Sequence, residues 1–192
     1  MHDPFKSENI RTYVTSLYQQ YEIPELLYHN LAHTEFVVKK THEIAANYKL
    51  DETEIFILSA AAWFHDTGQL FGETKDHEKR SVSIIRDYLK TKEIENKIID
   101  SVEGCIMATK LPHNPATLLE EIICDADTYN LGTKEFLKTD KQLKKEFELR
   151  NNIQKEKWEK ISLHFLETHK YFTPYSRLCS LKVNRKILKC YV

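Results

Sequence analysis

The chain contains few of the residues that interrupt regular structure. Its 192 residues include four glycines and five prolines, so few tight turns are signalled and long helices are favoured. Four cysteines occur without a CxxC pair, which indicates reduced thiols in a cytoplasmic protein. The nearest candidate for a membrane span, Ile55 to Phe64, is too short for the ~20 apolar residues that a transmembrane helix needs.

Charge of one sign is also lacking. With 28 basic and 29 acidic side chains the formal net charge is −1, which gives no global attraction to nucleic acid or to an anionic membrane. The N-terminal segment has no basic stretch followed by an apolar run, so no signal peptide is expected. A hydrophobic content of 41% and this length fit one soluble domain over residues 1–192.

Apolar residues recur at helical spacing through most of the chain. Residues 10–21 show the i, i+3, i+4, i+7 pattern most clearly. Helices are expected over residues 10–21, 30–48, 52–65, 77–91, 93–108, 118–127 and 174–188. Asn30 is the expected N-cap of the second of these helices. Residues 134–168 are expected to form either one long helix or two helices. Residues 69–75 and 111–115 are expected to be loops. The predicted fold is a single-domain, all-α bundle.

Two polar residues end a strongly apolar segment, SAAAWFHD, which places the side chains of His65 and Asp66 near the core. Burying a carboxylate is costly unless something compensates, and a divalent metal does so because it takes neutral imidazole and carboxylate as ligands. Asp127 follows a second apolar segment, LLEEIICDAD, and His33 lies on the expected inward side of its helix. These residues predict an octahedral metal site with positions open for water and substrate.

The order His33, His65-Asp66 and Asp127 resembles the H…HD…D pattern of the HD-domain metal-dependent phosphohydrolases. The flanking segments YHNLAH, AAAWFHDTG and ICDADTYNLG agree with that pattern over residues 28–132. The resemblance implies a helical HD-domain fold, followed here by C-terminal helices over 134–190. It also implies a divalent metal ion (Mn, Co, Ni, Mg, Fe or Zn) held by those four residues, with Asp125 in a supporting or capping role.

The segment YHNLAH is also similar to the signature of class I cyclic nucleotide phosphodiesterases. In that family the histidine four residues before the first metal-ligand histidine donates a proton to the leaving oxygen, and here that position is His29. The alternative is that His29 only packs or hydrogen-bonds near the site. Because TGQL follows the HD pair and the chain is shorter than that family's catalytic domain, the similarity does not identify a cyclic nucleotide as the substrate.

His77, eleven residues past Asp66, is the next candidate. Binuclear relatives carry extra histidines before the final aspartate, and His77 could match the first of them. The segment CIMATK offers no further histidine, so one tightly bound metal is favoured. Three roles stay open for His77: a phosphate-contacting or second-sphere residue, a second-metal ligand, or a helix-start residue only. The histidines at 2, 42, 164 and 169 are expected to be structural or exposed to water. His113, in the 111–115 loop, is expected to face water, with an approach to the pocket as the alternative.

Phosphate esters need positive charge beside their non-bridging oxygens. Arg80 and Lys110 are the basic residues nearest in sequence to His77 and to the ATK segment, so they are candidate phosphate contacts, with surface charge as the alternative. Acidic residues at 73, 76 and 78 follow the HD pair, and one of them could orient the attacking water.

The predicted function is metal-dependent hydrolysis of a phosphate ester, either a monoester or a diester, of a nucleotide or other small phosphorylated metabolite. A metal-activated water would attack, Asp66 is a candidate proton acceptor, and His29 or His77 a candidate proton donor. One alternative is a nucleotide-binding regulatory module with little turnover. Another is a di-iron oxygenase, which would need more histidines than this chain offers. Neither a membrane nor a nucleic acid is an expected partner, and homo-oligomerisation is left open.

Overall fold

The computed structural model describes residues 7–151 and 155–180, and the regular secondary structure in that part of the chain is entirely helical. The elements are α1 (Ser7–Gln20), α2 (Leu31–Ala45), α3 (Glu52–Phe64), η1 (Thr67–Phe71), α4 (His77–Lys90), α5 (Asn96–Ala108), α6 (Leu118–Asp127), η2 (Tyr129–Gly132), α7 (Phe136–Asn151), α8 (Lys155–Thr168) and α9 (Pro174–Ser180). The predicted all-α fold is confirmed. None of these helices has the length and apolar character needed to cross a bilayer.

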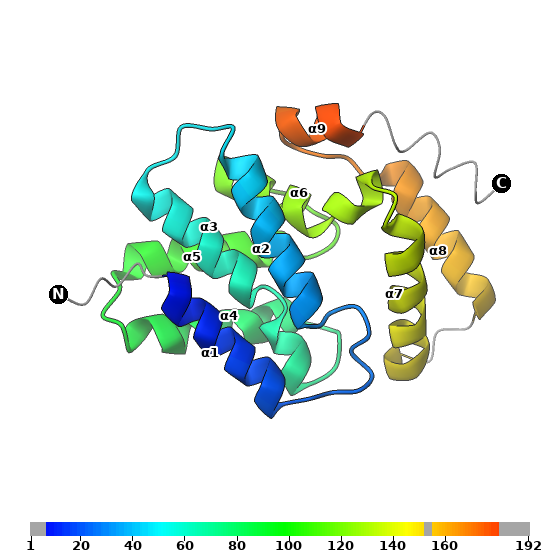
Figure 1. Cartoon of the computed structure of the whole chain (residues 1–192), viewed down its shortest axis with the longest axis horizontal. Coiled ribbons are helices and arrows are strands. Elements are labelled where there is room, and N and C mark those ends of the chain that lie inside the picture. Colours follow the sequence, from blue (N-terminus) through cyan, green and yellow to red (C-terminus); the bar gives the residue numbers. More distant parts are fainter. Residues whose placement is uncertain (1–6, 152–154, 181–192) are drawn as a thin grey trace.

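Helix α3 forms the centre of the core. All its residues from Phe56 to Phe64 are buried, because the segment FILSAAAWF is apolar around most of the helix circumference. The three alanines at 60–62 are fully buried and let neighbouring helices approach closely. Helices α1, α2, α5 and α6 pack around α3 (Figure 1), so the end of α3, where the HD pair lies, is inside the molecule.

Side-chain caps fix the beginnings of the two helices that lead to the site. The Oδ1 atom of Asn30 accepts hydrogen bonds from the backbone N–H groups of Ala32 and His33 at 3.0 and 3.2 Å, which confirms the predicted N-cap of α2. At the start of α3, Asp51 and Glu54 form a capping box. These contacts satisfy N–H groups that a first turn leaves without partners, and so they define where each helix begins.

The connection after the HD pair differs from the prediction. A loop is expected over residues 69–75, but residues 69–71 belong to the 3-10 helix η1. A Cβ at Gly68 would overlap the backbone carbonyl oxygen of His77 and would lie 2.8 Å from the backbone N of Ser81. The glycine therefore lets η1 pack directly on the first turns of α4. The polarity of the segment does not reveal this tertiary contact.

Several helix boundaries also differ. Helix α5 begins at Asn96, three residues later than predicted, and Glu93 has a φ of +56°, outside the helical region. Residues 134–168 form two helices, α7 and α8, which is one of the two predicted arrangements. The last helix is described to Ser180, and its predicted extension to residue 188 lies outside the described residues, as do His2 and Cys190.

Helices α7 and α8 stand beside the core rather than around α3 (Figure 1). A buried carboxylate joins the two: Oδ1 of Asp140 accepts hydrogen bonds from Nε1 of Trp158 at 3.0 Å and from Oγ of Ser162 at 2.7 Å. Because both donors are buried with their acceptor, these polar bonds are shielded from water and fix the pairing of the helices.

Candidate metal centre and active site

Four side chains from α2, the end of α3 and α6 converge in the interior. The Nε2 atom of His33 lies 3.4 Å from Nε2 of His65, 3.4 Å from Oδ2 of Asp66 and 3.1 Å from Oδ1 of Asp127. The Nε2 atom of His65 lies 3.2 and 3.5 Å from the same two carboxylate oxygens. The structure therefore brings together all four residues that the sequence predicts as ligands. We call these four residues the metal cluster.

The metal cluster fits a divalent cation. Nitrogen and oxygen ligands about 2.1 Å from one ion lie roughly 3.0–3.4 Å apart, close to the separations found here. The Oδ2 atom of Asp66 is buried and makes no hydrogen bond of suitable geometry in the described structure. Its nearest polar neighbours are the Nε2 atoms of His65 and His33, at 3.2 and 3.4 Å, and a cation between these three atoms would satisfy the oxygen. The Nδ1–H of His65 donates to the carbonyl oxygen of Ala62 at 2.9 Å, which leaves the Nε2 lone pair for a metal.

Opposite charges in the cluster shift the protonation of its members. Burial raises the pKa of Asp66 and of Asp127, but the adjacent imidazoles outweigh it and hold both pKa values well below their usual range. Burial lowers the pKa of His65, whereas the negative charges of Asp66 and Asp127 raise it well above 6.5. Both carboxylates are therefore ionised at neutral pH, as cation binding requires.

His77, the first residue of α4, reaches the same cluster. Its Nε2 atom lies 3.1 Å from Oδ1 of Asp66, while its Nδ1–H donates to the carbonyl oxygen of Thr74 at 2.9 Å. Asp66 thus faces His77 with one oxygen and the imidazoles of His33 and His65 with the other. This position is compatible with two of the roles left open by the sequence, a phosphate-contacting or second-sphere residue and a ligand of a second metal ion.

Two small residues dock α4 against the HD pair. The backbone N–H of Gly68 donates to Oγ of Ser81 at 2.8 Å, and that hydroxyl donates to the carbonyl oxygen of His65 at 2.7 Å. Both the hydroxyl and the glycine are fully buried or nearly so. The short connection between the HD pair and His77 is therefore fixed by local hydrogen bonds and close backbone packing.

His29 lies in the connection before α2, where Glu146 of α7 holds it. The Nδ1 atom of His29 lies 2.5 Å from Oε1 of Glu146, and Oε2 accepts the backbone N–H groups of Tyr28 and His29 at 2.7 and 3.1 Å. The His29 ring lies 5.9 Å from the His33 ring and 6.4 Å from the His77 ring, centroid to centroid. Its Nε2 atom makes no hydrogen bond to the described residues.

The surroundings also favour a proton on His29. Burial lowers the pKa of this imidazole, but the charge of Asp66 and the hydrogen bond to Glu146 raise it, and the net pKa is above 6.5. Burial raises the pKa of Glu146, while its hydrogen bonds from His29 and the backbone lower it, and the net pKa is below its usual value. The pair therefore consists of the Glu146 carboxylate, which readily loses its proton, and the His29 imidazole, which readily holds one.

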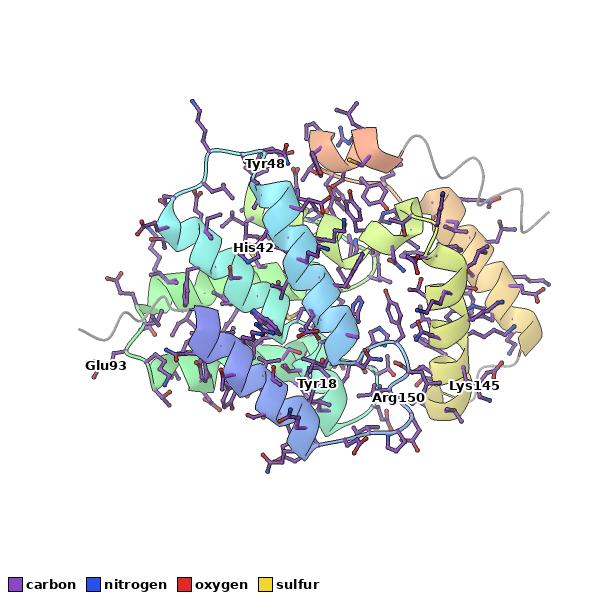
Figure 2. All side chains as sticks on the ribbon, in the orientation of Figure 1. Tyr18, His42, Tyr48, Glu93, Lys145 and Arg150 are labelled. Carbon is purple, nitrogen blue, oxygen red and sulfur yellow. The ribbon has the colours of Figure 1, made fainter. Side chains whose placement is uncertain are left out.

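One turn further along α7, Arg150 holds the connection after the HD pair. Its guanidinium donates to Oε1 and the carbonyl oxygen of Gln69 at 2.7 and 3.1 Å and to the carbonyl oxygen of Gly72 at 2.7 Å. It lies 3.8 Å from Oε1 of Glu146. Figure 2 shows Arg150 at the end of α7, on the side that faces the core. Helix α7 therefore fixes both connections that flank the metal cluster.

The sequence prediction misses Glu146 and Arg150. Both lie in a strongly charged segment that has the composition of a solvated helix face. The available signal is their i, i+4 spacing, but acid–base pairs at this spacing are common on exposed helices. Their burial follows from contacts with segments more than 70 residues away, which local patterns do not report.

The predicted phosphate contacts are engaged elsewhere. The guanidinium of Arg80 donates to the carbonyl oxygens of Gly68, Lys75 and Glu73, and thereby holds the connection before α4. The ammonium group of Lys110 lies 3.1 Å from Oδ1 of Asp76. Neither cation contacts the metal cluster in the described structure.

Other polar residues named from the sequence have structural contacts. Asp125 accepts the backbone N–H groups of Phe172 and Thr173 at 2.8 Å each and so anchors the start of α9. His113, expected to face water, is instead half-buried: its ring lies 6.2 Å from the Phe172 ring, and Nε2–H donates to the carbonyl oxygen of Thr109. His42 lies 3.2 Å from Oγ of Ser59. The cysteines at 105, 124 and 179 are free thiols.

Comparisons with known proteins bear on the fold and on the family of the chain. Among solved structures, the chain is similar to a predicted HD superfamily hydrolase from an uncultured Thermotogales bacterium. The TM-score is 0.65 at 18% identity, over 95% of this chain and 87% of the other, and at that identity the similarity bears on the fold alone. No curated protein matches the chain.

The family model of the HD domain matches residues 30–131, a segment that contains the whole metal cluster. The match and the His/Asp cluster together support a metal-dependent hydrolase in general. Because the match spans more than half of the sequence, the chain belongs to the HD-domain family.

Proposed function

We propose that this chain hydrolyses a phosphate ester of a nucleotide or other small metabolite. The observation that carries the proposal is the metal cluster, with its unpartnered buried oxygen on Asp66, beside an imidazole held by a buried carboxylate. Phosphate esters develop negative charge on oxygen as they react, so a cation and a proton donor at one site suit them.

His33, His65, Asp66 and Asp127 would hold the metal. A bound divalent cation lowers the pKa of a coordinated water and polarises phosphoryl oxygens. Asp66 is fixed in orientation because His77 contacts its Oδ1 atom at 3.1 Å. Its carboxylate would accept a proton from the attacking water, and His77 would maintain that orientation or contact the phosphate.

His29 is the proposed proton donor to the leaving oxygen. Glu146 accepts the Nδ1 proton, so the second ring nitrogen, Nε2, would carry the proton that is transferred. The Nε2 atom of His77 already contacts Asp66, which makes His77 the less available donor. This arrangement supports assigning the two imidazoles different roles.

Hydrolysis assays test the proposal. Nucleoside monophosphates, cyclic nucleotides and generic phosphate esters are incubated with the purified protein and Mn²⁺, Co²⁺, Ni²⁺ or Mg²⁺. We expect hydrolysis that EDTA abolishes and at least one ion restores, and products that distinguish a monoesterase from a diesterase. His65→Ala should be inactive, whereas His164→Ala, an exposed position on α8, should retain activity.

Retention of full activity in His65→Ala would contradict the proposal. Hydrolysis of none of the esters with any of the four ions would also contradict it. In that case, binding of nucleotides without turnover would favour the alternative of a regulatory nucleotide-binding module.

A further inference from the structure

Helices α7 and α8 have apolar contacts of their own. Among the described residues, neither helix contributes to the main apolar cluster around α3 or to the small cluster that joins α1 to η1. The two helices lie side by side (Figure 1), and the centroids of the Phe147 and Trp158 rings between them are 5.3 Å apart. At the end that adjoins η2, a separate cluster consists of Leu131, Phe136, Phe165 and Leu166. We call α7 and α8 together the arm, and this end its base.

The end of the arm farthest from the base is held by polar contacts. The guanidinium of Arg150 binds the connection after the HD pair, and Oγ1 of Thr74 donates to Oδ1 of Asn151 at 3.2 Å. Nearer the base, Glu146 and Gln142 bind the connection before α2. Water can replace hydrogen bonds of this kind when they open, whereas separating the apolar base would expose hydrophobic surface. Opening the far end therefore costs less than detaching the base.

The seam between the arm and the core is incompletely filled. A cavity of about 220 Å³ lies between α2 and α7, and it is lined by Ala32 and His33 on one side and by Lys138, Thr139 and Gln142 on the other. Packed protein interiors contain few voids larger than a water molecule. The arm therefore meets α2 across a loosely packed seam, and widening this seam would uncover the metal cluster at His33.

Two short non-helical connections join the base of the arm to the core. Residues 133–135 separate η2 from α7, and Thr133 has an extended backbone, with φ −124° and ψ 167°. Residues 169 and 170 follow α8, and beyond them the chain is fixed again, because Asp125 accepts the backbone N–H groups of Phe172 and Thr173. Changes in a few backbone dihedral angles at these two connections would turn the arm as one body.

We propose that the arm is a lid that turns about its base. In the open position the seam beside α2 widens and gives a substrate access to the metal cluster. In the closed position Glu146 contacts His29, so closure both covers the substrate and orients the proposed proton donor. The movement itself does not depend on the proposed function, whereas its effect on turnover rests on that function.

Amide hydrogen exchange, followed by NMR on the purified full chain, reports the movement without turnover. The backbone N–H groups of Tyr28 and His29 donate to Oε2 of Glu146, so they are shielded while the arm is closed. The N–H of His65, which donates to the carbonyl oxygen of Ala61, reports the opening of the core. We expect the two reporting amides to exchange about tenfold faster than the His65 amide, because the arm opens without unfolding α3. Equal rates would overturn the proposal.

A disulfide across the far end tests whether the arm is what moves. Thr74→Cys and Asn151→Cys place two thiols where the native side chains touch, and Cys179→Ser with Cys190→Ser removes two other thiols. The disulfide joins the arm to the connection after the HD pair, not to the segment that carries the two reporting amides. We expect oxidation to slow exchange at those amides about tenfold, and reduction to restore the native rate. Thr74→Cys alone, under the same oxidising conditions, is the control.

Arg150→Met gives the opposite perturbation, because it removes the guanidinium contacts of the far end. The two reporting amides should exchange about tenfold faster, while the His65 amide keeps its native rate. Lys141→Met is the matched control, since Lys141 is an exposed residue of α7, and it should leave both rates unchanged. This variant makes the test independent of whether the disulfide forms.

The outcomes separate the movement of the arm from the proposed function. Unchanged exchange at the reporting amides in the oxidised protein, or in Arg150→Met, would overturn the proposal. The oxidised form should hydrolyse the ester identified in the hydrolysis assays about tenfold more slowly and recover on reduction. Full activity in the oxidised form would overturn the role of the arm in admitting substrate. The expected exchange pattern in a protein that hydrolyses no phosphate ester would support the movement and contradict the proposed function.

Discussion

Glu146 and His29 are joined by a contact of 2.5 Å although they lie 117 residues apart in the chain. The same carboxylate accepts two backbone N–H groups from the connection that carries His29. A buried carboxylate with three hydrogen bonds is fixed in position. The orientation of the proposed proton donor therefore depends on α7, a helix that stands outside the core around α3.

Glu146→Gln should lower kcat about 10- to 100-fold while metal content stays the same, because the variant keeps the side-chain shape but loses the charge that orients His29. Steady-state kinetics and elemental analysis of the purified variant check this. Glu148→Gln is the control, since the contact of Glu148 within the described part of the chain is a surface pair with Lys145 at 3.5 Å. An unchanged kcat in Glu146→Gln, or an equal loss of metal, would contradict a positioning role.

Asp127→Asn should abolish stable metal binding, because it removes one of two anionic ligands and changes little in volume. In the native protein, EDTA should lower Tm by several degrees, since a ligand bound only by the folded state stabilises it. In Asp127→Asn, EDTA should leave Tm unchanged. Asp100→Asn, an exposed position on α5, should behave like the native protein in both measurements. Stoichiometric metal in Asp127→Asn would remove Asp127 from the ligand set.

The metal-free protein should be most stable at mildly acidic pH. The depressed pKa values of Asp66 and Asp127 contribute stability that is present above about pH 4 and is lost as pH falls through those folded-state values. The raised pKa of His65 contributes stability that is fully present below about pH 6.5 and is lost as pH rises through its folded-state value.

Urea unfolding in the presence of a chelator measures this dependence. We expect the free energy of unfolding to be greatest between about pH 4 and pH 6.5 and to fall on the alkaline side. Saturating divalent metal should remove the alkaline loss, because metal binding requires neutral imidazole. A rise in the metal-free free energy of unfolding between pH 6.5 and pH 8 would show that the His65 contribution has the opposite sign.

The core could be predicted because its signals are local, and the apolar segment before His65 and Asp66 indicates burial by itself. A buried carboxylate needs a partner or a metal, but the choice of the four candidate ligands rests on their resemblance to the H…HD…D pattern. Asn30 is a recognisable helix cap, and it fixes His33 on the inward side of α2.

The partners of these ligands could not be predicted because they depend on tertiary contacts. The guanidinium of Arg80 resembles a phosphate ligand in sequence, yet it is used by three backbone carbonyls of a connection whose path no local pattern encodes. Glu146 is buried and Arg150 half-buried by contacts with distant connections, although their own segment is strongly charged. Local periodicity reports which side of a helix is apolar, and it does not report which polar groups other segments will cover.

Gly68→Ala should reduce both stability and activity. A Cβ at this position would overlap the carbonyl oxygen of His77, which is backbone and cannot move aside without shifting α4. Overpacking of this kind costs about 1–3 kcal/mol of unfolding free energy, and the shift would separate His77 from Asp66. Denaturant unfolding and steady-state kinetics measure the two effects.

Gly104→Ala is the matched control for the glycine substitution. A Cβ there would meet only Oε1 of Glu120 at 3.5 Å, an ordinary van der Waals contact, and the position lies inside α5. Alanine in a helix interior is favoured over glycine by about 0.5–1 kcal/mol, so this variant should be slightly more stable and fully active. If the two variants behaved alike, close packing of η1 on α4 would not be what holds His77 at the metal cluster.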